Sequence, residues 1–277
     1  MSEEGISPMN SIHAAVLGAL QGFTEILPIS SSAHLLVVPW IFGWPESGIT
    51  FDVALHLGTL IALCLYFHRD IVDLVANFCT GLMRRNMLSP ATRLPFCIIL
   101  GTIPATFTGM FLEGPIEKIF RENPVIIALL LIVFGLLLAF SDYVGLKRWK
   151  MDRITFSSAM VIGIAQSLAL MPGVSRSGIT ITAALLLGYK RETAARFSFL
   201  LSLPIVAGAA LLKLGELVSR GIPAGEFVPL LIGVSASALV GYVSIAFLLR
   251  FVQRHTLSPF VWYRVLAGSA ILFYVLV

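Results

Sequence analysis

Residues 21–34, QGFTEILPISSSAH, place a carboxylate, three consecutive hydroxyls and an imidazole at the end of an otherwise apolar segment. Ionisable groups at membrane depth are costly to bury, so by default they mark a functional site. Pro28 and the serines after it also interrupt the helix, and irregular backbone is tolerated inside a bilayer only where protein buries it or where it lines a watery cavity. We therefore interpret this stretch as half of an active site within the membrane.

The composition of the whole chain agrees with a membrane setting. Of its 277 residues 57% are hydrophobic and only 12% are charged, and the mean hydropathy is +0.92. These values exclude an ordinary soluble domain and indicate an all-α polytopic membrane protein, with a single integral membrane domain over residues 1–277. The net charge of +4 does not indicate nucleic acid binding, because the basic residues fall in short loops between apolar segments.

Neither the N-terminus nor the cysteines change this interpretation. The first residues carry two glutamates and no positive charge, so no cleaved signal peptide is expected. Cys64, Cys79 and Cys97 lack the spacing of metal ligands and are expected to be small packing residues.

Apolar runs between charged residues, prolines and glycines predict ten helices. Residues 34–43 and 177–187 are too short for the roughly 20 residues that cross the hydrocarbon layer. Each follows a break in the chain, so each is expected to form a re-entrant helical hairpin with the helix before it. The other six are expected to be full spans. The ten segments are 10–27, 34–43, 51–67, 94–113, 124–141, 154–171, 177–187, 193–213, 227–249 and 259–277.

The positive charges favour two hairpins and six spans. In this arrangement the loops 68–93, 142–153, 188–196 and 250–258 share one side of the membrane and hold 13 lysines and arginines, against four on the other side. The positive-inside rule makes the 13 cytoplasmic and puts both termini outside the cytoplasm. If all ten segments crossed the membrane, this asymmetry would largely vanish.

The two halves of the chain, about 10–141 and 154–277, repeat each other. Each contains one hairpin and three spans, and an odd number of spans inverts the second half, so we predict an inverted-topology repeat with sites near the midplane. Residues 70–83 are apolar at helical period and are expected to lie on the cytoplasmic interface. The recurring residues are Gly18 and Gln21 with Gly163 and Gln166, Pro28 and Ser31 with Pro172 and Ser175 after a one-residue slip, and Gly101 and Gly109 with the spacing of Gly233 and Gly241.

The counterpart stretch in the second half, residues 172–180, PGVSRSGIT, indicates a phosphate site. The guanidinium of Arg176 matches two phosphate oxygens, and the flanking glycines let backbone N–H groups approach an anion, as does the start of the helix 177–187. A buried ion pair between Arg176 and Glu25 is the structural alternative, although it leaves the hydroxyls and glycines unexplained. The residues expected to bind substrate are Gln21, Ser30, Gly173, Ser175, Ser177, Gly178 and Thr180.

The first stretch offers groups for acid-base chemistry. Gln21 and Glu25 are four residues apart and share one helix face. Ser31 and His34 lie just past the break, where the imidazole can exchange a proton with a hydroxyl. Polar groups of this kind also serve as contacts between membrane helices, so alone they are weak evidence. His56, inside the next span, is left as either a supporting or a packed residue.

Together, Gln-x-x-x-Glu running into Pro-x-Ser-Ser-Ser-Ala-His, and Pro-Gly-x-Ser-Arg-Ser-Gly-x-Thr, resemble the undecaprenyl-diphosphate phosphatase family of the bacitracin-resistance type. The resemblance extends to FDVALHLGTL at 51–60, FSFLLSLP at 197–204 and FVWYR at 260–264, so it covers essentially the whole chain. Gln21 stands where the family permits Glu or Gln.

The resemblance implies hydrolysis of undecaprenyl diphosphate to undecaprenyl phosphate and inorganic phosphate, which recycles this lipid carrier for cell-wall polymers. It also implies a multi-pass protein of the bacterial inner membrane, a site open to the periplasmic face and a divalent cation, Mg²⁺ or Ca²⁺. The expected partners are the polyprenyl diphosphate lipid and the bilayer, without nucleic acid; a homodimer is left open.

Such a reaction depends mainly on positioning and electrostatics. We expect Arg176 to hold the phosphates, and Glu25, with Gln21 beside it, to coordinate the metal or act as base. Ser31 is the candidate nucleophile and His34 its proton partner. Attack by His34, with Ser31 orienting it, stays open.

Two other function classes were weighed. An inverted repeat with two hairpins is also a transporter plan, so a lipid-carrier flippase or anion transporter is the alternative function. Transport needs Arg176 but has no obvious need for Ser31 and His34. A second lipid phosphatase superfamily is set aside because the chain lacks its Lys-x6-Arg-Pro signature. For the phosphatase we predict that the tips 28–34 and 172–180 meet in one cavity.

Overall fold

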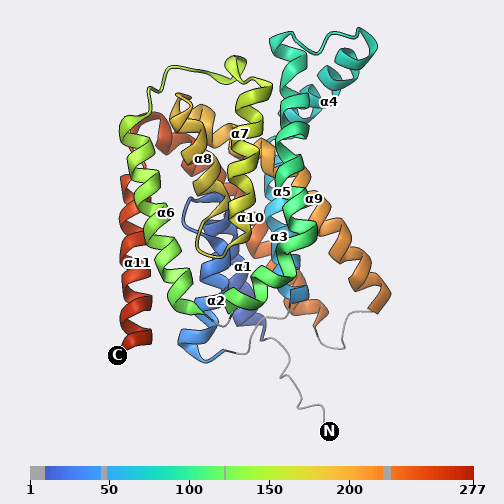
Figure 1. Cartoon of the computed structure of the whole chain (residues 1–277). Coiled ribbons are helices and arrows are strands. Elements are labelled where there is room, and N and C mark those ends of the chain that lie inside the picture. The colour runs from blue at the N-terminus through green and yellow to red at the C-terminus, as the bar shows by residue number, and fades with distance from the viewer. Residues whose placement is uncertain (1–9, 45–48, 122, 221–225) are drawn as a thin grey trace.

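The computed structural model describes residues 10–44, 49–121, 123–220 and 226–277, which form eleven α-helices and two short 3₁₀ helices (Figure 1). The all-α fold is confirmed. Each of the ten predicted segments corresponds to a helix, and the eleventh, α4, matches the predicted amphipathic segment. The helices are α1 (Ser11–Ile26), α2 (Ser31–Phe42), α3 (Ile49–Tyr66), α4 (His68–Met83), α5 (Pro90–Arg121), α6 (Pro124–Val144), α7 (Phe156–Ser167), α8 (Arg176–Leu186), α9 (Arg191–Arg220), α10 (Phe227–Arg254) and α11 (Ser258–Leu276); the 3₁₀ helices are Met151–Arg153 and Leu168–Leu170.

Helix length and hydropathy identify the candidate spans among the described residues. Helices α5, α6, α9, α10 and α11 are long and apolar enough to cross a membrane, and α3 qualifies together with α4, from which it is bent by 77°. Helices α1, α2, α7 and α8 have 16, 12, 12 and 11 residues, fewer than the roughly 20 a span requires. The described residues therefore contain up to six candidate spans, as fits a multi-pass membrane protein.

The two hairpins approach each other from opposite ends of the molecule. Helices α1 and α2 extend inward from the end where the C-terminus lies, while α7 and α8 extend inward from the other end (Figure 1). Their turns meet near the middle. This is the arrangement expected of two re-entrant hairpins, although their position in a membrane stays a prediction.

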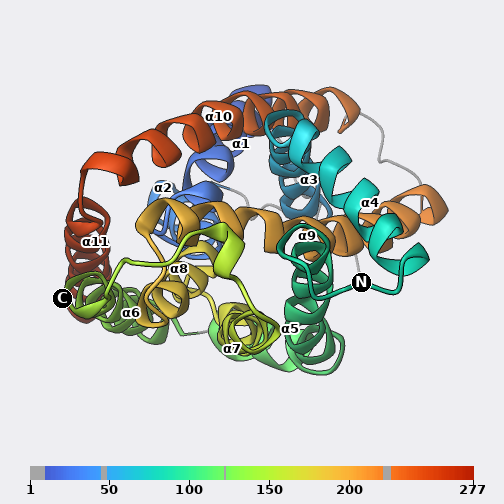
Figure 2. The same ribbon diagram turned by 90° about the horizontal axis from the view of Figure 1, so that it is seen from above.

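Each hairpin packs on the opposite half of the chain through a glycine pair. Helix α1 lies along α10, and α7 lies along α5 (Figure 2). A Cβ added to Gly18 would stand 2.2 Å from the carbonyl oxygen of Gly233, and one added to Gly163 would stand 2.2 Å from that of Gly101. Small residues permit such close approach of helix backbones in membranes. Because the sequence repeat pairs Gly18 with Gly163 and Gly101 with Gly233, the two crossings are equivalent, which supports the predicted repeat.

The hairpin tips correct the predicted register of that repeat. Ser30 precedes α2 and Ser175 precedes α8, with φ angles of 75° and 71°, which are uncommon for residues other than glycine. These two serines are 145 residues apart, the same offset that relates the recurring glycines and glutamines of the hairpins. The one-residue slip that matched Ser31 with Ser175 is therefore wrong. Ser31 corresponds instead to Arg176.

A buried arginine on α11 joins the two tips. Arg264 is 0% exposed, and its guanidinium donates hydrogen bonds to the carbonyl oxygens of Pro28 at 3.2 Å, Gly173 at 2.8 Å and Val174 at 3.0 Å. A further bond goes to the carbonyl oxygen of Leu131 on α6. Because these acceptors come from both tips, one side chain sets the position of one tip relative to the other.

Candidate active site

The two motifs meet, as predicted. The Nη2 atom of Arg176 lies 2.6 Å from Oε1 of Glu25. Two more hydrogen bonds join the hairpins at their tips: the N–H of Gly173 donates to Oγ of Ser30 at 3.1 Å, and Oγ of Ser177 donates to the carbonyl oxygen of Leu27, just before the first tip, at 3.0 Å. The ion pair considered as the structural alternative is thus present, and it lies within the predicted joint site.

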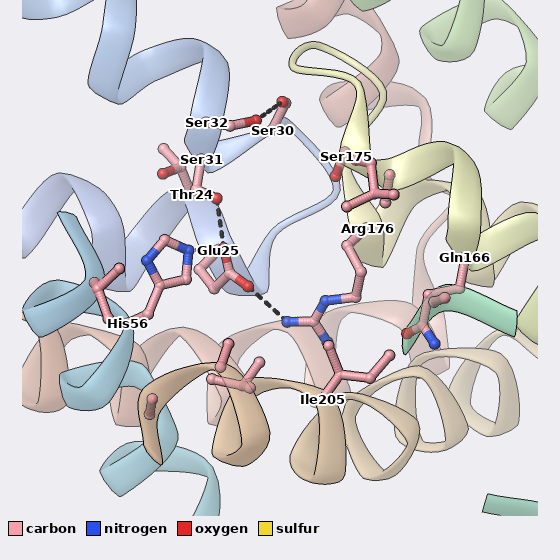
Figure 3. A pocket seen from close by; sticks show the side chains of 17 residues that line it. Thr24, Glu25, Ser30, Ser31, Ser32, His56, Gln166, Ser175, Arg176 and Ile205 are labelled. Atoms are coloured by element: carbon pink, nitrogen blue, oxygen red, sulfur yellow. Dashed lines mark hydrogen bonds and ion pairs between the residues drawn. The ribbon is translucent and has the colours of Figure 1, made fainter. Parts of the chain in front are cut away.

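A cavity of about 270 Å³ surrounds this ion pair (Figure 3). One side of it is polar and includes Glu25, Ser31, His56 and Arg176. Helix α9 supplies an apolar wall. Such a cavity suits a ligand with an anionic head and a hydrocarbon chain. The apolar residues from α9 are Ile205, Val206, Ala209 and Ala210.

Glu25 is the centre of the hydrogen-bond network. While Oε1 accepts from Arg176, Oε2 accepts from the hydroxyl of Ser31 and from Nε2 of Gln21 at 3.4 Å. The Nε2 atom of His56 lies 3.7 Å from the same oxygen. A carboxylate that accepts a hydrogen bond from a serine hydroxyl has the geometry of a base beside a nucleophile.

Several buried polar atoms around this network have no hydrogen-bond partner among the described residues. They are Nη1 of Arg176, Oε1 of Gln21, and both Nε2 and Oε1 of Gln166. Buried polar groups are nearly always paired, and an unpaired one often indicates a ligand or ion site. The cavity therefore has donors and acceptors that the protein itself does not use.

His34 does not lie where the sequence analysis put it. Its Nδ1 is 2.6 Å from the carbonyl oxygen of Ser30, and its Nε2 is 2.6 Å from the hydroxyl of Tyr263 on α11. Both ring nitrogens are engaged, and the ring borders a second, mainly apolar cavity between α2 and α11. The expected pair of Ser31 with His34 is replaced by a pair of Ser31 with Glu25. The histidine that borders the Glu25 cavity is His56.

The predicted substrate ligands divide into two groups. Ser30 and Ser175 line the cavity, and Gln21 contacts Glu25. The other predicted ligands form hydrogen bonds within the protein. For example, the N–H of Gly178 donates to Oγ of Ser175 at 3.1 Å. This second group secures the tips instead of forming the cavity wall. Its members are Gly173, Ser177, Gly178 and Thr180.

Two residues of this region were not selected from the sequence. Gln166 lines the cavity, and its signal was its match with Gln21 in the repeat. Arg264 lies inside an apolar span, and an isolated charge at that depth is a signal of function. In the sequence it is the last residue of FVWYR.

A divalent cation would find suitable oxygen atoms beside Glu25. The unpaired Oε1 of Gln21 and the carboxylate of Glu25 are hard oxygen donors of the kind that Mg²⁺ and Ca²⁺ prefer. In the described part of the chain no group of three or more His, Cys, Asp and Glu side chains could enclose a metal. These residues fit a cation that takes its remaining ligands from phosphate oxygens and water.

Known proteins resemble this chain over almost its full length. The family described as bacitracin resistance protein BacA matches residues 14–270. An undecaprenyl-diphosphatase of Geobacter metallireducens is 67% identical over 267 residues, which cover 96% of this chain and 99% of that protein. The undecaprenyl-diphosphatase of Geobacter sulfurreducens is 65% identical, covering 96% and 98%, and that of Thermomicrobium roseum is 47% identical, covering 95% and 98%.

Proposed function

The chain belongs to the bacitracin resistance protein BacA family, and on that premise we propose that it is a membrane phosphatase for undecaprenyl diphosphate. The products are undecaprenyl phosphate and inorganic phosphate, so the enzyme recycles the lipid carrier for cell-wall polymer synthesis. The observation that carries this proposal is the contact of Glu25 with both Ser31 and Arg176 at one cavity wall, opposite the apolar surface of α9.

Arg176 is the phosphate anchor. Its Nη2 is held by Glu25, whereas the buried Nη1 has no hydrogen-bond partner among the described residues and would donate to a phosphate oxygen. A guanidinium gives strong, directed hydrogen bonds to phosphate. Because Arg176 is also the first residue of α8, the helix dipole adds to the positive potential there.

Ser31 is the nucleophile in this proposal, and Glu25 is its base. The Ser31 oxygen attacks the terminal phosphorus while its proton passes to Oε2 of Glu25, the atom that already accepts its hydrogen bond. The bond between that phosphorus and the bridging oxygen breaks, and undecaprenyl phosphate leaves. Glu25 passes the serine proton to the departing undecaprenyl phosphate and is again a carboxylate. Water then attacks the phosphoserine while Glu25 takes a proton from it. The bond between phosphorus and the Ser31 oxygen breaks, the proton returns to that oxygen, and inorganic phosphate is released. Attack by His34 would first require the attacking ring nitrogen to give up its hydrogen bond to Ser30 or Tyr263.

We also propose that Glu25 and Gln21 hold a divalent cation, Mg²⁺ or Ca²⁺. When bound, it would neutralise charge on the phosphate oxygens. The support is the unpaired amide oxygen of Gln21 beside the carboxylate.

The proposed location is the bacterial inner membrane, with the cavity open to the periplasmic side. The four basic loops lie at one end of the molecule and the C-terminus at the other (Figure 1). The positive-inside rule makes the basic end cytoplasmic.

Purified protein in detergent tests the proposal. With undecaprenyl diphosphate and Mg²⁺ or Ca²⁺, the wild type should release inorganic phosphate, and Ser31→Ala should not. A detergent micelle has no two sides, so phosphate release separates hydrolysis from transport. Wild-type protein that releases no phosphate, but moves the lipid across vesicles, would favour the flippase alternative.

A further inference from the structure

Gln166 is a buried amide that the catalytic scheme above does not use. Its side chain lines the Glu25 cavity, and the residue is 2% exposed. Neither Nε2 nor Oε1 has a hydrogen-bond partner among the described residues. A buried amide with both polar atoms unpaired is rare in folded proteins, and at a cavity wall it indicates a ligand contact.

The repeat explains why this amide is unpaired. Gln21 occupies the same position in the first hairpin, and its Nε2 donates to Glu25 one helical turn later. In the second hairpin the residue that matches Glu25 is Leu170, which has no acceptor. Gln166 thus keeps the position of Gln21 but lacks its partner, and both residues of the second hairpin border the cavity.

Arg176 divides the polar side of the cavity into two parts. Glu25 and Ser31 lie on one side of the guanidinium, and Gln166 lies on the other (Figure 3). The Nη2 atom of Arg176 is bound to Glu25, and its Nη1 has no partner in the described part of the chain. A diphosphate has two linked phosphoryl groups. If Ser31 attacks the terminal one, the lipid-linked one lies on the side of Gln166.

We propose that Gln166 binds the lipid-linked phosphoryl group of the diphosphate substrate through its Nε2–H donor. It is a substrate-binding residue that holds the part of the substrate that departs, and it lets the site distinguish a diphosphate from inorganic phosphate. This inference rests on the proposed phosphatase function. A neutral amide suits the role, because it orients the group without adding a charge that would retain the anionic product.

Kinetics with a short soluble substrate test this role. Gln166→Met keeps the side-chain volume and removes both polar atoms, and Gln166→Ala is the second variant. With farnesyl diphosphate as substrate and farnesyl phosphate as product inhibitor, KM and the inhibition constant of farnesyl phosphate should both rise about tenfold, because a hydrogen bond to a charged group is lost. The inhibition constant of inorganic phosphate, which binds on the Ser31 side, should stay within about twofold.

Ser167→Ala is the matched control. Ser167 is the next residue of α7, its hydroxyl bonds to the carbonyl oxygen of Gly163, and it does not line the cavity. All three constants should match the wild type. The melting temperature of each variant in detergent shows that it is folded.

Different results overturn the inference and the proposed function. An active wild type with unchanged farnesyl phosphate inhibition in a folded Gln166→Met variant excludes a contact with the lipid-linked group. If the variant binds farnesyl phosphate and inorganic phosphate more weakly by the same factor, Gln166 does not act on the lipid-linked phosphoryl group alone. This result would also overturn the inference. A wild type that hydrolyses neither farnesyl nor undecaprenyl diphosphate contradicts the proposed function instead.

Discussion

The two hairpins of this protein share a backbone and differ in chemistry. Both cross the opposite half of the chain at a glycine pair, and in both the second helix begins after a serine with positive φ. At matching positions, however, the first hairpin carries Glu25 and Ser31, and the second carries Leu170 and Arg176. The repeat thus supplies two equivalent walls, and differences at a few matched positions give one wall a carboxylate and a hydroxyl and the other wall a guanidinium.

Dividing the charges between the hairpins has an energetic consequence. A carboxylate or a guanidinium buried alone is costly, and removing one partner of a buried pair leaves the other uncompensated. Glu25 and Arg176 therefore compensate each other only when both hairpins are folded together. The catalytic site is a property of the joined halves, not of either hairpin.

The largest expected effect on the reaction rate comes from removing the Ser31 hydroxyl, which only the first hairpin provides. Ser31→Ala should lower kcat for undecaprenyl diphosphate at least about a thousandfold, about 4 kcal/mol in barrier, because the attacking oxygen is lost. Phosphate release in detergent measures this. Ser32→Ala, which removes the adjacent hydroxyl, should cost far less. If Ser31→Ala keeps more than about a tenth of the wild-type rate, the nucleophile is His34 or an activated water.

Arg176→Lys tests the cationic wall of the second hairpin. The change keeps the charge but replaces a planar guanidinium, which contacts Glu25 and has a further donor, with a point-charge ammonium. We expect kcat/KM to fall about a hundredfold, about 2.7 kcal/mol. Near-normal turnover would mean that Arg176 contributes only its positive field.

The shared scaffold predicts matched losses of stability. Gly18→Ala and Gly163→Ala each place a methyl group against a backbone carbonyl oxygen, so each should reduce stability by about 1–3 kcal/mol. Thermal unfolding in detergent should show similar decreases for both. Gly208→Ala on α9, where a Cβ would have no neighbour within 4 Å, is the control and should not lower the melting temperature. A large drop for only one crossing glycine would contradict the equivalence of the two crossings.

The smallest expected effect concerns a feature with no counterpart in the second hairpin. His34 joins the backbone of Ser30 to Tyr263, so His34→Gln and Tyr263→Phe should each lower kcat by only about threefold to tenfold, the effect of losing one hydrogen bond. Each substitution breaks the same series of hydrogen bonds from Ser30 through His34 to Tyr263. The kcat of the double variant should therefore be little lower than that of either single variant. A thousandfold loss in His34→Gln, beside normal activity in Tyr263→Phe, would restore His34 as the proton partner of Ser31.

Much of the architecture follows from the sequence alone. Hydropathy, the two short segments 34–43 and 177–187 and the distribution of positive charges predict six spans and two hairpins, because all three are properties of the chain that do not depend on its tertiary contacts. The two polar motifs were also recognisable, since charges at membrane depth are conspicuous. These signals selected Glu25, Ser31 and Arg176, which the structure places in contact.

Tertiary packing decided which side chains face the cavity. His34 follows Ser31 by one helical turn, so spacing alone put the two on one face, yet Tyr263 of α11 and the carbonyl oxygen of Ser30 bind its ring away from the cavity. Periodicity assigns a residue to a helix face, but only the neighbouring helices determine what that face meets. For the same reason, two features depend on the tertiary structure and could not be inferred from the sequence. One is the link that Arg264 makes between the two tips. The other is the amide of Gln166, which has no hydrogen-bond partner among the described residues.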